Sequence, residues 1–479
     1  MNLKLVPFAA MAALMATSCS KEEVMEINYD PDGKAITFTA GVGHSRAVET
    51  TVKNLGDFKV VAKGIHPHGG IYNNYMIGSA TDGETATRSS LNQDDKDGKW
   101  SGIWKLDHNV SWPTATTSAL FWAYTFSQLQ DDNTKTAVMP TGVTLAFNTE
   151  GTTPSINNFK PVKADLKAAS NAGYWNDGDN QSDFLIAFTQ QKRTDGTSVN
   201  LNFNHALCQV DIKAQSANKQ DNDDRIVKIK GAWIVNTNNT GNISAGYNWD
   251  DANKEATIDP KWSASIAAND FSAYGSFYTT PILLDTKNTV KNLLGSTLMI
   301  IPQTTTAWNK TTADTEGTYI LLLCRVELEH QGTAHTGTDS DPDNTTLDDV
   351  EIYNGKHYHQ QFPVNSENKF KAGEYGFVCV PVATDWAMGK RYVYNLDICG
   401  AATGAGSYPL DLADKFKTLV PENHKYNTLF GEEATLDIIP RGDVKAVGEP
   451  VLDAPIQFTV TVESWKDAGS EWTDGNVNL

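Results

Sequence analysis

The chain has 479 residues and a formal net charge of −19. A surface of this sign repels polyphosphate, so the composition argues against nucleic acid as a partner. Hydrophobic residues make up 40% of the chain. At this length and composition, one to three domains with cores of their own are expected.

The first residues have the pattern of an export signal. Lys4 precedes an apolar stretch, Val6–Met15, that is shorter than the roughly 20 residues a membrane-spanning helix needs. Small residues lead to Cys19, an arrangement that fits a lipoprotein cleavage box with acylation of Cys19. The polar run Ser20–Glu23 resembles a surface-export signal, and a solvated tether is its alternative. We expect a signal peptide over 1–19 and a lipid anchor in the outer membrane; an ordinary secretory signal is the alternative.

Short runs rich in Val, Ile, Thr and aromatic residues recur along the chain, separated by Asn, Asp, Gly and Thr clusters. This pattern predicts strands of β-sandwiches or barrels rather than βαβ units. In chain order the expected strands are Ala35–Ala40, Asp57–Gly64, Ser118–Phe126, Gly142–Asn148, Asp183–Gln190, Val199–Ala214, Arg225–Asn236, Gly275–Leu284, Ser296–Pro302, Tyr319–Glu329, Gly376–Val382, Arg391–Cys399 and Ile456–Trp465. The best helical candidate is Leu412–Leu419.

The most polar stretch between two clusters of expected strands is Gln215–Asp224, where we place a domain boundary. The expected organisation is the signal peptide, a tether with a removable N-terminal strand over 20–46, an N-terminal domain over 47–218 and a C-terminal domain over 224–479.

Four cysteines follow the leader, and all lie in apolar runs: Cys208, Cys324, Cys379 and Cys399. Their spacing fits no CxxC or zinc pattern. Buried free thiols are the simpler interpretation. A disulfide is the alternative, because pairing cannot be deduced from sequence.

Six blocks in chain order resemble the pattern of fimbrillin (Mfa-like) domains. They are Asp57–Ala62, Val110–Tyr124, Asp183–Ala187, Leu201–Leu207, Leu298–Gln303 and Gly389–Tyr394. Each block alone is an ordinary strand, but six in order are specific. The resemblance implies an all-β type V pilin with two transthyretin-like β-sandwich domains in tandem. It also implies export as a lipoprotein, cutting by a trypsin-like protease and polymerisation by strand exchange into a fimbria that serves adhesion. The implied partners are other pilin subunits, in a homopolymer that could include anchor and tip subunits.

Strand exchange needs a donor whose apolar side chains alternate, so that one face fills a hydrophobic groove. The candidate replaced strand has on one face Ile36, Phe38 and Ala40. The candidate donor has on one face Ile456, Phe458, Val460 and Val462. Both contain Ile-x-Phe-Thr, so either could fill similar pockets in the same register. The alternative is that both are edge strands of their own sandwiches.

The link after the candidate replaced strand, residues 41–48, contains Gly, His and Ser, a setting that favours proteolysis. The only Lys or Arg in this link is Arg46, and the Arg46–Ala47 bond matches the position at which the family is processed. We expect cleavage there; an uncut loop arginine is the alternative. The match favours a stalk subunit over an anchor, with a tip subunit as a third interpretation.

Other motifs favour structural explanations. His357 and His359 could lie on one strand face, but no third metal ligand is evident. The acidic run 339–343 lacks the glycine and the bidentate glutamate of a calcium loop. No hydrolase or phosphate-binding motif is present. We therefore expect no enzyme, no cofactor and no metal, and hold a surface hydrolase as the least favoured hypothesis.

The twelve tryptophans raise the question of sugar stacking. Trp104, Trp112 and Trp122 lie in or beside expected strands, so we interpret them as core residues. A surface glycan-binding lipoprotein, with the same leader and the same β-architecture, is the alternative function.

Overall fold

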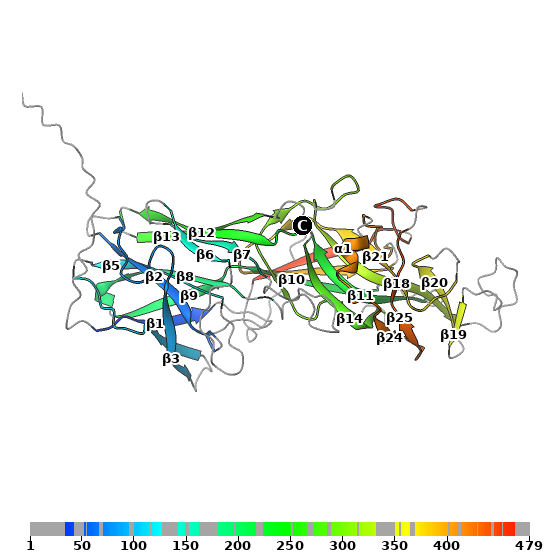
Figure 1. Ribbon diagram of the computed structural model, residues 1–479, viewed down its shortest axis with the longest axis horizontal. Coiled ribbons are helices and arrows are strands. Elements are labelled where there is room, and N and C mark those ends of the chain that lie inside the picture. Colours follow the sequence, from blue (N-terminus) through cyan, green and yellow to red (C-terminus); the bar gives the residue numbers. More distant parts are fainter. Residues whose placement is uncertain are drawn as a thin grey trace, which may run out of the picture.

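The computed structural model is elongated and almost entirely β-structure (Figure 1). Strands from the first two hundred residues gather at one end, and strands from residues 319–362 and 425–435 gather at the other. The structure describes residues 34–42, 52–53, 55–66, 70–94, 100–114, 116–126, 142–148, 153–161, 181, 183–195, 197–216, 224–250, 252–253, 255–265, 272–284, 289–313, 316–331, 350–353, 356–364, 369–400, 403–410, 413–428, 430–441, 445–452 and 454–464.

Seven strands close into a barrel at the first end, in the order β1-β4-β3-β2-β5-β8-β9. Their bounds are β1 Thr37–Val42, β2 Phe58–Ile65, β3 Glu84–Gln93, β4 Trp100–Lys105, β5 Ser118–Thr125, β8 Leu185–Lys192 and β9 Ser198–His205. A short 3-10 helix, Arg193–Asp195, joins β8 to β9. All neighbours pair antiparallel except β1 and β9, which run parallel. The first of the described strands therefore closes the barrel between two strands that come later in the sequence.

A four-stranded sheet covers one outer face of the barrel, in the order β13-β12-β7-β6. Its strands are β6 Thr144–Phe147, β7 Pro154–Phe159, β12 Thr240–Asp250 and β13 Glu255–Ser265. Apolar side chains from this sheet, such as Leu145, Ile156 and Ile243, pack against Leu120 and Trp122 of β5. Both faces of β5 are buried as a result, which explains its unbroken apolar run.

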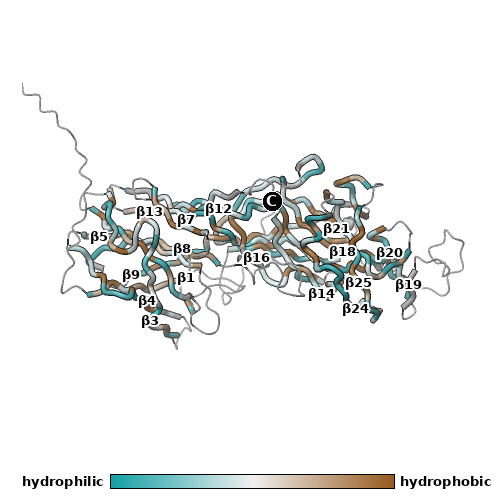
Figure 2. Tube along the Cα trace, viewed as in Figure 1, coloured by the Kyte–Doolittle hydropathy of each residue, from teal (hydrophilic) through white to brown (hydrophobic). Residues whose placement is uncertain are grey.

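The other half contains two facing sheets. One has the order β15-β10-β23-β27, with β16 on β10; its strands are β10 Cys208–Gln215, β15 Lys291–Asn292, β16 Leu298–Ile300, β23 Lys390–Asp397 and β27 Gln457–Ser464. The second has the order β14-β11-β18-β20-β19, with β21 on β18 and β26 on β21; its strands are β11 Asp224–Val235, β14 Ala273–Leu284, β18 Tyr319–Gln331, β19 Val350–Tyr353, β20 Lys356–Phe362, β21 Glu374–Pro381 and β26 Asp437–Ile438. Between them lies one apolar core, and hydrophobic residues accordingly gather around β16 and β18 (Figure 2).

A third layer covers the outer face of the second sheet. It includes the helix α1 (Ala413–Lys417) and the paired strands β24 (Lys425–Asn427) and β25 (Glu433–Thr435). Phe416, Leu419 and Tyr426 of this layer pack against Trp233 and Leu321 of the sheet. One further pair, β17 (Thr304–Thr305) with β22 (Thr384–Asp385), completes the described strands.

The all-β class expected from the sequence is confirmed, and every expected strand overlaps an observed one. The expected helix Leu412–Leu419 corresponds to α1. One expected strand, Val199–Ala214, is wrong as a single element. It divides at Ala206–Leu207 into β9, a barrel strand, and β10, which belongs to the other half. The tandem transthyretin-like layout stays a prediction.

The expected domain boundary at Gln215–Asp224 falls largely on residues 217–223, which lie outside the described ranges. Strand pairing runs across it in both directions. β10 precedes this segment yet pairs with β23, and β12 follows it yet pairs with β7 of the barrel half. Within the ranges given above, no helix has the length and apolar character needed to cross a bilayer.

Candidate functional site at the barrel seam

The seam of the barrel is the strand β1, and its side chains alternate between core and surface. Ile36, just before the strand, is 2% exposed, Phe38 is fully buried, and Ala40 is half-buried against the barrel core. The Ile36 N–H donates to the Val110 carbonyl (2.7 Å) and the Thr37 N–H to the Thr197 carbonyl (2.9 Å). The residues expected on one face thus point into the barrel.

Phe38 is a fully buried residue of this core. Its ring makes edge-on contacts with Phe58 (5.9 Å between centroids) and Phe121 (6.2 Å), which come from β2 and β5. Phe58 in turn packs on Trp104, whose indole N–H donates to the Gly56 carbonyl (2.8 Å). Removal of β1 would withdraw Phe38 and expose two strand edges, β4 and β9, together with the apolar groove between them.

The strand β27 occupies a very different position. It is the last strand of its sheet and pairs only with β23 among the described strands, from Gln457 opposite Asp397 to Ser464 opposite Lys390. Ile456 is buried, whereas Phe458, Val460 and Val462 are half-buried against the core of the C-terminal half. Within its own subunit, the apolar face of β27 is therefore only partly covered.

Besides this ladder, β27 is held by long side-chain hydrogen bonds, from Asn395 to Thr461 (3.5 Å) and from Lys390 to Ser464 (3.4 Å), and by packing. Phe458 packs on Tyr394 of β23 at 6.1 Å between ring centroids. On the polar face, the Arg391 guanidinium binds Asp211 closely through Nε (2.7 Å), but it reaches Glu463 of β27 only at 4.0 Å. A partly buried ion pair of that length adds little stability.

The two strands present the same side chains in the same order. Each has Ile, then Phe two residues later, then Thr: Ile36-x-Phe38-Thr39 and Ile456-x-Phe458-Thr459. Thr39 faces outward, where its hydroxyl donates to the Asn200 amide oxygen of β9 (3.4 Å). Thr459 would take the same place if β27 were threaded in this register.

Sequence reasoning placed Trp104 in a core and Val199 and Leu201 in a strand, but it did not bring them together as the walls of one groove, where all three are fully buried. The signal for β9 in the sequence was the alternation of polar and apolar residues over Ser198–His205, which the period-two burial of this strand matches. Three expected site residues, Cys19, Arg46 and Ala47, lie outside the described residues.

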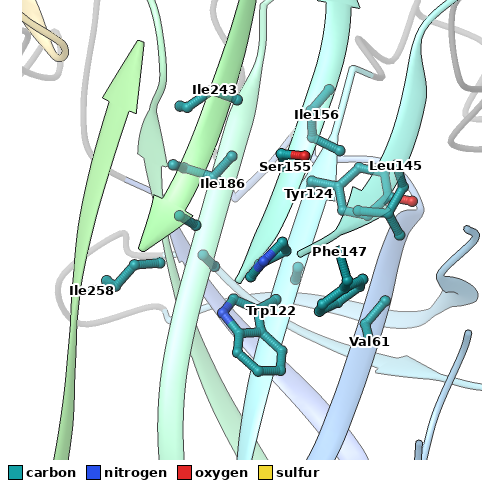
Figure 3. Close-up of a pocket in the computed structure, with 14 residues that line it drawn as sticks. Val61, Trp122, Tyr124, Leu145, Phe147, Ser155, Ile156, Ile186, Ile243 and Ile258 are labelled. Carbon is teal, nitrogen blue, oxygen red and sulfur yellow. The ribbon is translucent and has the colours of Figure 1, made fainter. Parts of the chain in front are cut away.

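Trp104, Trp112 and Trp122 are all at least 96% buried, which confirms their interpretation as core residues. Trp122 also lines an apolar pocket of about 40 Å³ between the barrel and the sheet that covers it (Figure 3). Most of its lining is aliphatic or aromatic, and it includes no Asp, Glu, Asn, Gln, Lys or Arg. Sugars are held by several hydrogen bonds from such groups, so this pocket does not suit a glycan.

The four cysteines are buried and form no disulfide with one another. Burial raises the pKa of the Cys208, Cys324 and Cys379 thiols, so these thiols are poor nucleophiles. Within the described part of the chain, no three His, Cys, Asp or Glu side chains lie close enough together to hold a metal.

A sequence profile described as Fimbrillin-like matches residues 70–407. Among solved structures, the chain is similar to a fimbrial protein from Bacteroides vulgatus, with 16% identity, coverage of 76% of this chain and 95% of that one, and a TM-score of 0.40. It is also similar to the tip fimbrial protein Mfa3 from Porphyromonas gingivalis with C-terminal truncation, with 9% identity, the same two coverages and a TM-score of 0.26. No curated protein matches the chain.

Proposed function

The chain belongs to the fimbrillin-like family, and from this premise we propose that it is a structural subunit of a cell-surface fimbria that serves adhesion. In this proposal, proteolysis removes the N-terminal strand β1. The C-terminal strand β27 of a second copy then fills the groove between β4 and β9.

One observation carries the proposal: β1 closes the barrel, and β27 has the same inward-facing pattern while lying at the edge of its own sheet. Within its own subunit, β27 pairs with one neighbour among the described strands. In the emptied seam it would pair with two, β4 and β9, as β1 does. The exchange therefore gains a ladder of main-chain hydrogen bonds on the donor's second edge.

Apolar burial favours the exchange as well. Without β1, the groove would expose the apolar surfaces that Ile36 and Phe38 cover. Both side chains are almost completely buried in the structure. Ile456 is already buried in its own subunit, but completing the burial of the half-buried Phe458, Val460 and Val462 would add about half of the usual 1.5–3 kcal/mol each, a gross gain on the order of 2–5 kcal/mol before the cost of ordering the donor strand.

Processing is the second part of the proposal. The subunit would be held in the outer membrane by acylated Cys19, and a trypsin-like protease would cut the Arg46–Ala47 bond to release both the lipid anchor and β1. The support is the sequence pattern around these residues. In the assembled fibre each subunit would be free of lipid.

The test is to compare the N-terminus of the protein from intact cells with its state of assembly. We expect free Ala47 in polymers and acylated Cys19 in monomers. Purified full-length chain treated with trypsin should form high-order assemblies on size-exclusion chromatography, and a chain that lacks residues 456–479 should not. Cut protein that stays monomeric and is retained on immobilised polysaccharide would refute the proposal in favour of a glycan-binding lipoprotein.

A further inference from the structure

The two strands that compete for the groove match at Ile36 and Ile456 and at Phe38 and Phe458. At the third inward position the first strand has Ala40 and the last has Val460. We infer that Ala40 sets the direction of exchange, because it leaves the seam underfilled until a donor strand supplies valine. This inference rests on the proposed function and concerns its regulation.

Ala40 is the smallest of the three inward-facing side chains of the first strand, and part of its surface is open to solvent. Ala40 pairs with Leu201 of β9 and is only half-buried. On the other side the register of β1 with β4 runs from Thr37 opposite Lys105 to Thr39 opposite Ile103, so the next residue along β4 is Gly102. The wall of the groove beside Ala40 is therefore a glycine.

The ring of Trp104 lies over that glycine: a Cβ placed on Gly102 would be 2.5 Å from two carbons of the ring. A branched side chain at position 40 would accordingly meet an aromatic surface on the β4 side and Leu201 on the β9 side. Such contacts are favourable for an aliphatic group.

Val460 would bring two more carbons than Ala40 into this place. For half to full burial of two carbons, valine at this position holds a strand in the groove roughly four- to fifteen-fold more tightly than alanine does. In the uncut chain, β1 therefore closes the barrel. After cleavage, it is held in the groove less tightly than the donor strand that replaces it.

The test uses Ala40→Val in the full-length chain, because Ala40 belongs to the first strand alone, whereas Val460 also packs in its own half. Before cleavage, we expect Ala40→Val to raise the midpoint of urea unfolding of the barrel half. After trypsin treatment, we expect release of the N-terminal peptide and growth of polymers to slow roughly four- to fifteen-fold. The matched control, Thr39→Val, adds no inward-facing carbon and should assemble at the wild-type rate.

The outcomes separate the two proposals. If wild-type cut protein polymerises and Ala40→Val polymerises at the same rate, the inference fails and the proposed function stands. If the uncut Ala40→Val chain is less stable than wild type, the groove has no room for valine and the inference fails without reference to assembly. If wild-type cut protein never polymerises, the proposed function fails first.

Discussion

Lys230 lies directly against the ring of Tyr426, with its Nζ atom 3.4 Å from the ring centroid. The ammonium donates to the Thr279 carbonyl (2.6 Å) and lies 3.3 Å from Nε2 of His424. Its side chain is fully buried and faces no carboxylate in these contacts. The third layer of the C-terminal half therefore closes over a lysine side chain.

A pH dependence follows from this contact. Burial lowers the pKa of Lys230 from 10.5 to about 7. Between these values the unfolded chain holds the proton and the folded chain does not, so Lys230 makes the free energy of unfolding rise with pH, by up to about 1.4 kcal/mol per pH unit. Below pH 7 both states hold the proton and this contribution stays constant.

We predict that Lys230→Met reduces this rise between pH 7 and 9, as measured by urea unfolding at several pH values. Lys425→Met is the matched control, because Lys425 is exposed and paired with Glu433 at 2.7 Å. An unchanged pH slope in Lys230→Met would show that the lysine keeps its proton inside the fold.

Glu327 is buried between Lys228 and Arg325, which lie on the same face of the sheet as its carboxylate. Its carboxylate accepts from Lys228 Nζ (2.8 Å) and from Arg325 Nε (2.5 Å). We predict that Glu327→Ala costs roughly 3–5 kcal/mol of unfolding free energy, because it leaves two buried cations without their carboxylate. Guanidinium denaturation measures the effect.

The control for Glu327 is Glu433→Ala, which breaks the exposed pair with Lys425 and should leave the denaturation midpoint nearly unchanged. A Glu327→Ala chain as stable as this control would mean that water reaches the buried cations.

Phe458 tests the donor role of β27. We predict that Phe458→Asp leaves the monomer folded, since Phe458 is only half-buried at home, but prevents polymerisation of the cut chain. The reason is that a carboxylate without a partner cannot enter an apolar groove. Circular dichroism and size-exclusion chromatography report the two properties.

Gln457→Asp is the control for Phe458, because Gln457 is the exposed neighbour on the opposite face. This variant should still polymerise. If Phe458→Asp unfolds the monomer, β27 is an indispensable part of its own core instead.

Phe38 tests the part that β1 plays in the uncut chain. We predict that Phe38→Ala lowers the free energy of unfolding of the barrel by roughly 3–5 kcal/mol, because a fully buried ring with two aromatic neighbours is lost. Thr39→Ala, one residue on and facing outward, should have a much smaller effect. Equal effects of the two changes on urea unfolding would mean that the strand contributes pairing rather than packing.

Alternation of side chains made part of this fold predictable. Ser198–His205 has strict period-two burial, and the inward faces of β1 and β27 follow from Ile36 and Phe38, and from Ile456 and Phe458. These strands have one apolar and one polar face, which a sequence displays directly.

The crossover after β9 could not be predicted in this way. Ala206 and Leu207, where β9 ends and the chain moves to the other half, are fully buried and contain no turn-forming residue. The hairpin of β12 and β13 was missed for the opposite reason. Its Gly, Asn, Ser and Lys residues have the composition of a loop, yet β12 and β13 pair along their whole length and β12 also pairs with β7.

The buried charges were hidden as well. Lys228 and Lys230 on β11, with Arg325 and Glu327 on β18, alternate with apolar residues as if one face of each strand met solvent. The covering residues, such as Tyr426 and Phe430, come about a hundred positions or more later in the chain. A local sequence pattern cannot show that residues so far along the chain will cover a charged strand face.

The parallel pairing of β1 with β9 has a mechanical consequence for a fibre built as proposed. A donor strand threaded between β4 and β9 would be pulled along its own axis, from the end that leads back to its parent subunit. Force in that direction shears both ladders at once, so that their hydrogen bonds share the load rather than opening one after another. A fibre joined by such seams would resist force along the donor strand far better than force that lifts the strand out from one end.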